Sequence, residues 1–399
     1  MNITIQPGRL RGTVNVPPSK SMAHRALIAA ALADRPTVIH IRRLNDDIEA
    51  TIAALTALGA TIERDSEQGL LTVRPLGTID QQPLTLDCGE SGSTLRFLLP
   101  VACALGATAT FTGRGRLPSR PNAALTLVLR AHGANIDRDA LPIAVSGKLC
   151  GGEWELPGDI SSQYVTGLLF ALPLLREDSE ITLTTPLQSA DYVEMTLDAL
   201  KTFGIVIEKR EQGYIVPGGQ RYISSGDMTI EGDWSAAAFW FAANALGSDI
   251  DVAGVSKDSA QGDRAVLELL GQPEIDATHV PDLVPALAAV AAALPGRTTI
   301  TGAARLRLKE SDRLKAVADM VNALGGHVEV TADGLIIDGG AVHGGTVDGC
   351  NDHRIVMAAA ILATVADGPV TIIGAEAVSK SYPDFFEHLK EMNGSVGRN

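Results

Sequence analysis

The chain has 399 residues, and because a single hydrophobic core stops growing near about 250–300 residues, two domains are expected. Hydrophobic residues make up 45% and charged residues 20%, which excludes a disordered chain. The net charge of −14 argues against nucleic acid and anionic membranes as partners, so any anionic ligand needs a locally basic pocket.

The sequence indicates neither a membrane span nor an export signal. No apolar run approaches the about 18–20 residues that cross a bilayer, and Met1 to Pro7 lacks a basic region followed by an apolar one. The four cysteines lie far apart, without a CxxC pair or a histidine at zinc spacing, which argues against a disulfide framework and a structural metal. We therefore expect a cytoplasmic protein.

One pattern occurs six times: an apolar-periodic helix ends in a glycine, and a run rich in β-branched residues follows directly. The glycines that end these helices are Gly59, Gly133, Gly204, Gly271, Gly325 and Gly394. Their spacing is close to one sixth of the chain. Six such units predict three per domain.

Each unit also contains an earlier helix rich in Ala and Leu. These earlier helices are expected to begin near Lys20, Gly92, Ser162, Trp234, Asp282 and Asp352. The predicted order of elements in a unit is therefore strand, helix, strand, helix and then one or two strands. The fourth unit is short by about 15 residues and is expected to lack a hairpin.

The first of these helices begins with a group of polar residues. Ser19 is expected to be its N-cap after two prolines, and Ser21 and Arg25 share a helix face beside Lys20. Backbone N–H groups, the helix dipole and two cations suit a phosphate or carboxylate. The alternative is a capped surface helix with solvated cations.

The second helix follows a turn of small residues, Gly89 to Arg96, that would let the backbone approach a ligand. A basic loop comes next and contains Arg114, Arg116 and Arg120. Both segments could also be ordinary solvated loops.

The third helix opens with Ser161, Ser162 and Gln163, whose side chains suit polyol hydroxyls or phosphate oxygens. Simple N-capping would need only one of them. Ser189 and Tyr192 begin the helix after it, three residues apart and so on one face, and either could be only a cap.

In the second half, Lys309 and Arg313 are expected one helical turn apart, with Glu310 on another face. A carboxylate flanked by cations beside a bound anion is the arrangement expected of a proton-transfer residue. An ordinary charged helix face is the alternative.

Asp282 precedes a buried-looking helix and could be a general base or only a cap, while Arg354 and Lys380 place further cations near helix starts. Most of these polar groups fall at corresponding positions of the repeat, and together they supply eight cations in an acidic chain. The eight are Lys20, Arg25, Arg96, Arg120, Lys309, Arg313, Arg354 and Lys380. This indicates more than one anionic group bound at once.

Seven segments, all in order, resemble the EPSP synthase (3-phosphoshikimate 1-carboxyvinyltransferase) family of enolpyruvyl transferases. They are SKSMAHRAL at 19–27, CGESGSTLRFL at 88–98, LPSRP at 117–121, SSQYVTGLL at 161–169, KESDRL at 309–314, NDHR at 351–354 and KSYPDF at 380–385. The resemblance runs essentially from end to end.

The resemblance implies an α/β fold, the two-lobed inside-out α/β barrel of six βαβαββ repeats, three per lobe. It places residues 1–20 plus 230–399 in one lobe and residues 21–229 in the other, with the active site in the cleft between them. The hinge would lie near Pro18 and Gly232.

The implied reaction transfers the enolpyruvyl group of phosphoenolpyruvate to the 5-hydroxyl of shikimate 3-phosphate, in the biosynthesis of chorismate and aromatic amino acids. A tetrahedral intermediate forms and then loses phosphate. The family pattern also implies that the enzyme is a monomer without cofactor or metal.

The resemblance assigns site residues by matching positions. For shikimate 3-phosphate they are Lys20, Ser21, Arg25, Ser161, Ser162, Gln163, Ser189, Tyr192, Asp282 and Lys309. For phosphoenolpyruvate they are Lys20, Gly92, Ser93, Arg120, Gln163, Arg313, Arg354 and Lys380. The implied catalytic residues are Asp282, which takes the hydroxyl proton, Glu310, which protonates the methylene carbon, and Lys20.

Two positions depart from the family pattern, since Glu90 and Arg305 each stand where asparagine is usual. Two other functions remain as alternatives. A UDP-amino-sugar enolpyruvyl transferase would carry a reactive cysteine in the loop at 112–121, which has none. A non-catalytic sugar-phosphate binding protein would not need Asp282, Glu310 and Lys380 together.

Overall fold

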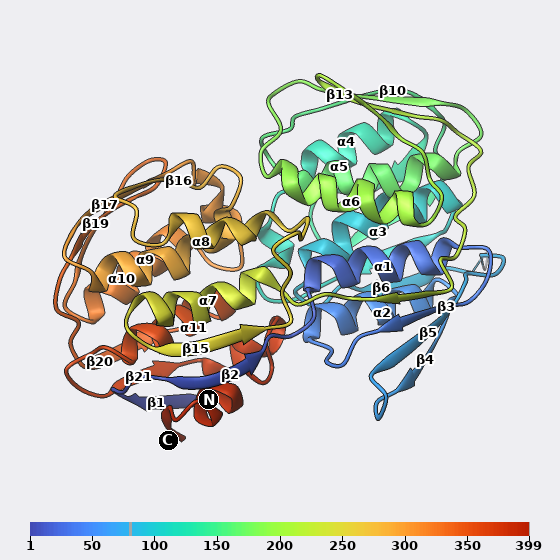
Figure 1. Ribbon diagram of the computed structural model, residues 1–399. Coiled ribbons are helices and arrows are strands. Elements are labelled where there is room, and N and C mark those ends of the chain that lie inside the picture. Colours follow the sequence, from blue (N-terminus) through green and yellow to red (C-terminus); the bar gives the residue numbers. More distant parts are fainter. Residues whose placement is uncertain (80–81, 399) are drawn as a thin grey trace. The chain divides into compact units, whose positions relative to one another are not determined.

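The chain forms two units in the computed structural model, which describes residues 1–79 and 82–398. Unit 1 comprises Met1–Pro17 and Glu231–Asn399, and unit 2 comprises Pro18–Ile230 (Figure 1). Lys20, which the sequence placed with unit 1, belongs to unit 2, because it begins helix α1 (Lys20–Leu32), whose apolar residues lie in the core of that unit.

One repeat shows the common pattern of both units. Its elements in chain order are β6 (Leu84–Asp87), α3 (Gly92–Leu105), β7 (Ala109–Thr112), α4 (Ala123–Ala131), β8 (Ala134–Ile136) and β9 (Ile143–Gly147). The strands form one sheet in the order β6-β7-β9-β8. Strands β6 and β7 are parallel because a helix connects them, whereas β8 and β9 form an antiparallel hairpin.

Unit 2 also contains sheets of the orders β14-β3-β5-β4 and β10-β11-β13-β12. Its other elements are β3 (Thr37–His40), α2 (Asp46–Ala57), β4 (Thr61–Asp65), β5 (Leu70–Arg74), η1 (Leu117–Ser119), β10 (Gly152–Leu156), α5 (Ser162–Ala171), η2 (Leu172–Leu174), β11 (Ser179–Leu183), α6 (Ala190–Thr202), β12 (Glu208–Arg210), β13 (Gly213–Val216) and β14 (Asp227–Thr229).

Unit 1 contains sheets of the orders β16-β17-β19-β18, β20-β21-β1-β22 and β15-β2. Its first elements are β1 (Asn2–Gln6), β2 (Arg11–Asn15), α7 (Trp234–Ala245), β15 (Asp249–Ala253), η3 (Gly262–Ala265), α8 (Val266–Leu269), β16 (Glu274–Asp276), η4 (Pro281–Leu283) and α9 (Val284–Ala293). The rest are β17 (Gly296–Thr301), η5 (Ala304–Leu308), α10 (Arg313–Ala323), β18 (His327–Val330), β19 (Leu335–Gly339), β20 (Gly345–Asp348), α11 (His353–Ala363), β21 (Val370–Ile373), η6 (Ala375–Lys380), α12 (Phe385–Glu391) and β22 (Ser395–Arg398).

Strands distant in sequence complete three of the repeats. Strand β14 pairs in parallel with β3 as the first strand of the first repeat, although it comes near the end of unit 2. Strand β2 pairs in parallel with β15, and β1 lies between β21 and β22 in the last repeat. In each unit, a strand from the early part of its chain and one from the late part therefore share a sheet.

The fourth repeat lacks the hairpin, as its short length predicted. Its sheet has two strands, β2 and β15, and a helix α8 of four residues leads directly to β16. Asn244 at the end of α7 compensates at the open edge of β15. Its Nδ2 donates to the Ile250 carbonyl and its Oδ1 accepts from the Ile250 N–H, both at 2.8 Å.

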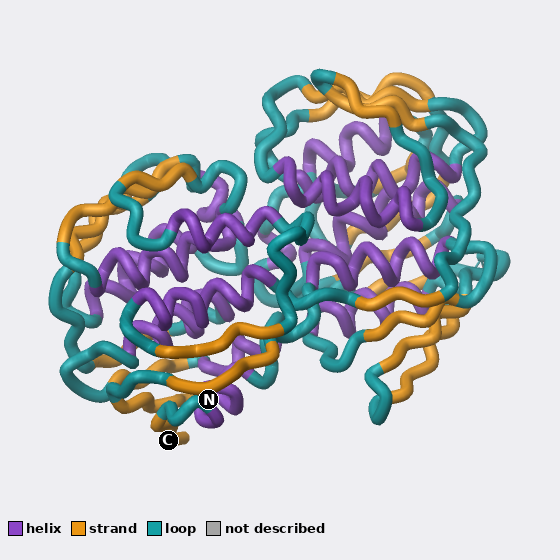
Figure 2. The backbone as a smooth tube through the Cα atoms, in the orientation of Figure 1, coloured by secondary structure: helices purple, strands orange, loops and turns teal. Residues whose placement is uncertain are grey.

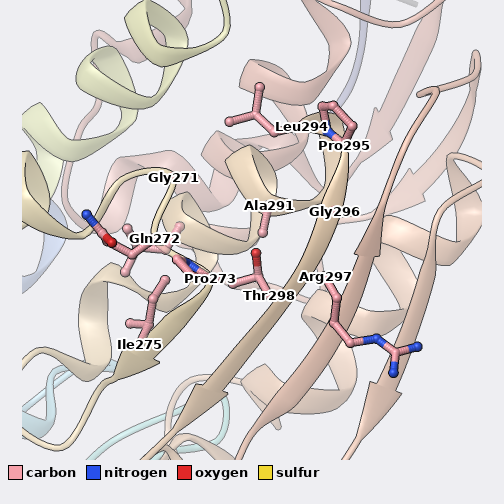
Figure 3. A pocket seen from close by; sticks show the side chains of 11 residues that line it. Gly271, Gln272, Pro273, Ile275, Ala291, Leu294, Pro295, Gly296, Arg297 and Thr298 are labelled. Carbon is pink, nitrogen blue, oxygen red and sulfur yellow. The ribbon is translucent and has the colours of Figure 1, made fainter.

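A pocket of about 350 Å³ lies beside this shortened repeat (Figure 3). Its lining includes Leu287, Ala291 and Leu294 from α9 and its end, together with Gln272 and Thr298. The pocket includes none of the residues that the sequence assigned to substrates.

The first helix of each repeat is buried, and the sheets lie outside the helices in each unit (Figure 2). All residues of α11 are buried, and so are nearly all of α9, because these helices consist largely of Ala, Val, Leu and Ile. Small side chains let such helices pack closely. This is the predicted inside-out α/β architecture.

Five of the six repeat glycines have positive φ, as the expected helix ends require. The prediction for Gly394 was wrong, because Asn393 (φ 66°) is the left-handed residue that ends the last helix, and Gly394 follows it. A side chain at Gly394 would collide with Leu389, which explains the glycine there.

No helix in the part of the chain that the structure describes is long and apolar enough to cross a membrane. Within the same residues, no group of three or more His, Cys, Asp or Glu is placed to hold a metal ion. All four cysteines are free thiols.

Candidate active-site residues

Polar side chains cap the buried helices where the sequence placed candidate ligands. Ser19 accepts a hydrogen bond from the Met22 N–H, Ser91 from the Thr94 N–H and Ser161 from the Gln163 N–H. Helix N-termini carry partial positive charge and unpaired N–H groups, so these positions favour anions.

Arg313 is the centre of the cluster in unit 1, and its side chain is only 1% exposed. Its Nη1 donates to Asp282 at 2.8 Å, its Nη2 donates to Glu310 at 2.6 Å, and its Nε donates to Asp352 at 2.7 Å. Burial lowers the pKa of Arg313, but the three carboxylates raise it above its ordinary value, so the guanidinium stays charged.

Asp282 lies among three cations. Arg354 donates to its Oδ2 at 3.0 Å, and the Lys309 Nζ lies 3.4 Å from its Oδ1, beside Arg313. Burial raises the pKa of Asp282, but Arg354, Lys309 and Arg313 together hold it well below its ordinary value. Asp282 is therefore an ionised carboxylate and does not cap the following helix.

The sequence reasoning missed Asp352 as a member of this cluster. Asp352 is fully buried and accepts from the Ser311 hydroxyl at 2.9 Å as well as from Arg313. Its Oδ1 also accepts from the Arg354 N–H, which makes it the N-cap of α11. The signal was present, since aspartate just before an Ala-rich helix is a typical N-cap.

The expected geometry of Lys309 and Arg313 was wrong. Helix α10 begins at Arg313, and Lys309 follows the 3-10 helix η5, so the two cations are not one helical turn apart. They nevertheless meet at Asp282. Lys380 ends η6 and donates to the Asn351 carbonyl at 2.6 Å, next to Asp352 in sequence.

In unit 2, Lys20 forms an ion pair of 2.8 Å with Asp47, a buried partner that the sequence reasoning did not identify. Arg25 is buried and donates to the carbonyls of Ser21 and Tyr192, both at 2.6 Å. Burial lowers the pKa of Arg25 to about 10, and its guanidinium lies over the Phe97 ring. The backbone of α1 and α6 thus fixes this cation.

Gly92 and Arg120 are in contact, because a Cβ at Gly92 would lie 2.8 Å from the Arg120 Nη1. Ser93 accepts a hydrogen bond from Gln163 at 3.0 Å, so the starts of α3 and α5 are adjacent. Arg96 orients the other end of that amide by donating to the Gln163 Oε1 at 2.7 Å.

Ser161 and Ser162 lie at the start of α5, and Ser162 is buried. Ser189 precedes α6 in the left-handed region (φ 54°), and its side chain makes no capping hydrogen bond. Ser189 is therefore the N-cap residue of α6 by position, but its side chain does not do the capping. Tyr192 contributes its carbonyl to Arg25.

The profile of the EPSP synthase (3-phosphoshikimate 1-carboxyvinyltransferase) family matches residues 5–275 and 271–389. Two curated relatives, from Clostridium novyi and Clostridium kluyveri, both named 3-phosphoshikimate 1-carboxyvinyltransferase, are 39% and 41% identical. The alignments cover 99% of this chain and 98% of each relative. The chain belongs to the EPSP synthase family.

Solved structures agree with this membership. An EPSP synthase from Acinetobacter baumannii is 26% identical with a TM-score of 0.82, and all of both chains is covered. The enolpyruvyl transferase NikO from Streptomyces tendae is 19% identical with a TM-score of 0.79 over 100% of this chain and 98% of that one, which shows the shared fold. The predicted family, fold class and enolpyruvyl transferase activity are confirmed.

Glu90 and Arg305, the two residues that depart from the EPSP synthase pattern, each contact a neighbouring loop. A side chain at Gly115 would collide with the carboxylate of Glu90, so Glu90 lies against the basic loop after β7. Arg305 donates to the Thr278 carbonyl at 2.9 Å, which ties η5 to the loop after β16.

Proposed function

We propose that this chain transfers the enolpyruvyl group of phosphoenolpyruvate to the 5-hydroxyl of shikimate 3-phosphate and releases phosphate. The observation that carries the proposal is the pair of carboxylates, Asp282 and Glu310, joined to one buried cation, Arg313. Such a pair can remove one proton and deliver another within a single site.

In the proposed reaction, Glu310 gives a proton to the methylene carbon of phosphoenolpyruvate. Positive charge then develops at C2, the 5-hydroxyl oxygen adds there, and Asp282 takes the hydroxyl proton. The tetrahedral intermediate then breaks its C–O bond to phosphate, and the methyl group returns its proton to Glu310. Asp282 passes the hydroxyl proton to the departing phosphate, so both carboxyl groups regain their starting protonation states.

The depressed pKa of Asp282 fits a base that works beside anions. The cations keep it ionised and ready to accept a proton. A phosphate or carboxylate that binds Lys309, Arg313 or Arg354 would offset their charge, and the proton affinity of Asp282 would rise.

For shikimate 3-phosphate we propose the ligands assigned by the family pattern. They are Lys20, Ser21, Arg25, Ser161, Ser162, Gln163, Ser189, Tyr192, Asp282 and Lys309. The starts of α1 and α5 support this assignment, because serine hydroxyls lie at both helix N-termini and Lys20 begins α1.

For phosphoenolpyruvate we propose Lys20, Gly92, Ser93, Arg120, Gln163, Arg313, Arg354 and Lys380. The contact between Gly92 and Arg120 and the hydrogen bond between Gln163 and Ser93 support a shared anion site in unit 2. Each assigned set contains residues of unit 1 and residues of unit 2. We therefore also propose that residues of both units act on the same two substrates. Cations that bind the phosphate would stabilise it as it leaves.

We further propose a cytoplasmic monomer, which the four free cysteines and the family pattern support. Sedimentation of the purified protein tests the monomer. A single species near the chain mass of 41.7 kDa is expected, and a dimer would contradict it.

The test is phosphate release with both substrates present and with each omitted in turn. Release should require both, and Glu310→Gln should reduce kcat by about 10²–10⁴-fold. Glu376→Gln is the matched control, because Glu376 pairs with the chain's N-terminus on the surface and should retain activity. Release with a UDP-amino sugar instead would favour that alternative, and binding without release would favour the non-catalytic one.

A further inference from the structure

Asp263 is a buried carboxylate of unit 1 that belongs to neither assigned substrate set. It lies in η3 of the shortened fourth repeat and is 4% exposed. The Ser235 hydroxyl, in the first turn of α7, donates a hydrogen bond to its Oδ2. A buried carboxylate away from the surface has to be stabilised or protonated, so its position calls for an explanation.

The loop before Asp263 is fixed to the start of α7. Gln261 accepts from the Trp234 N–H at 3.2 Å and donates to the Gly232 carbonyl at 2.9 Å. Its amide also donates to Glu231 at 2.6 Å. These hydrogen bonds fix the loop that leads to Asp263 against the start of α7, and the Ser235 hydroxyl binds the carboxylate itself.

Asp263 faces charged groups from each of three elements. They are Asp233 at the start of α7, Asp282 in η4 and Arg354 in α11, and the elements η3, η4 and α11 all pack against α7. Burial and the charge of Asp282 raise the pKa of Asp263, while Arg354 and the Ser235 hydrogen bond lower it, with a result of about 6. Asp263 thus changes its charge near neutral pH, whereas Asp282 stays ionised.

We propose that Asp263 is a positioning residue of the transfer reaction, which acts through Arg354 and Asp282 and sets how readily Asp282 accepts the hydroxyl proton. This inference rests on the proposed role of Asp282 as the base. An ionised Asp263 offsets part of the Arg354 charge, so a proton on Asp282 is better tolerated. A protonated Asp263 leaves Asp282 under the full field of its cations, and Asp282 becomes a weaker base.

The experiment compares kcat from pH 5 to 8 for the wild type, Asp263→Asn and Ser235→Ala. The wild type should lose activity toward acid pH as Asp263 takes up a proton. Asp263→Asn should have about tenfold lower kcat at pH 7.5, no such acid limb, and a KM for shikimate 3-phosphate within about twofold of the wild type. The two curves should meet near pH 5, where both carry an uncharged side chain.

Ser235→Ala is the matched variant, because it keeps the carboxylate and removes the donor that lowers its pKa. Its acid limb should move to higher pH. A purely structural role would lower the thermal midpoint and leave the shape of the pH profile unchanged, which overturns the inference. An unshifted limb in Ser235→Ala overturns it as well, even if Asp263→Asn fails to fold.

Failure of the proposed function gives a different result. A wild type that releases no phosphate with both substrates overturns both proposals. An active wild type whose acid limb persists in Asp263→Asn overturns only the role of Asp263.

Discussion

Asp352 and Arg313 are joined by two hydrogen bonds, of 2.7 and 3.3 Å, although 39 residues separate them in the chain. Both side chains are almost completely buried. The same carboxylate caps α11 through the Arg354 N–H. One aspartate therefore holds the guanidinium of Arg313 and the backbone of Arg354, both of which we assign to phosphoenolpyruvate.

Replacement of Asp352 by asparagine should separate its two roles. Asparagine also caps helices well, so α11 should keep its start, but the buried Arg313 loses one of its three counter-charges. We expect a loss of about 3 kcal/mol in the free energy of unfolding and at least a tenfold higher KM for phosphoenolpyruvate. Urea unfolding and steady-state kinetics measure both.

The control is Asp319→Asn, because Asp319 also pairs with a cation, Lys315, but does so on the exposed face of α10. That change should leave stability and KM within error of the wild type. An unchanged KM for phosphoenolpyruvate in Asp352→Asn would show that Arg313 does not depend on Asp352 for its position.

Replacement of Gly92 by alanine should weaken phosphoenolpyruvate binding. The added Cβ would lie 2.8 Å from Nη1 and 3.0 Å from Cζ of Arg120, so the guanidinium must shift. We expect KM for phosphoenolpyruvate to rise about tenfold or more, with a smaller change in KM for shikimate 3-phosphate. Gly77→Ala is the control, because a Cβ there meets no atom within 4 Å. Equal KM values for the two variants would contradict the assignment of Arg120.

Much of the fold was predictable because it depends on local signals. Ser19 and Ser91 mark helix starts by capping, and a left-handed glycine such as Gly59 marks a helix end. Repetition of these signals disclosed the repeats and the missing hairpin. The exchange of β1, β2 and β14 between distant parts of the chain was not predictable from residues alone, since strand pairing leaves no local mark.

The candidate site was predictable residue by residue but not as a network. The motif around Lys309 and Arg313 suggested a helix, whereas the chain turns before α10 and brings both cations to Asp282. Charge pairs such as Lys20 with Asp47 depend on packing between helices, which periodicity does not encode. The family resemblance suggested the candidate ligands, and the structure added residues, such as Asp352, that hold their side chains.

The buried charge of Asp263 should also appear in the pH dependence of stability. Its folded pKa of about 6 lies above the ordinary value of 3.8, so the folded state binds the proton more tightly than the unfolded state. The stabilisation is complete below pH 3.8 and is lost as the pH rises through about 6. The asparagine of Asp263→Asn cannot ionise, so this variant does not lose that stability as the pH rises.

The stability of Asp263→Asn relative to the wild type should therefore improve by up to about 3 kcal/mol between pH 4 and pH 7. Urea unfolding at both pH values measures the difference. A relative stability that does not change with pH would mean that Asp263 has the same pKa in the folded and unfolded states.

Removal of the Asn244 side chain should destabilise the shortened fourth repeat. Asn244 satisfies both the N–H and the carbonyl of Ile250 at the edge of β15, where other repeats have a hairpin strand. Asn244→Ala should lower the free energy of unfolding by about 1–3 kcal/mol, because Ile250 is 6% exposed and its polar groups lose their partners. Asn244→Asp keeps an acceptor for the N–H and loses only the donor, so it should lie between alanine and the wild type. A loss in Asn244→Asp as large as that in Asn244→Ala would mean that the Ile250 carbonyl alone needs the side chain.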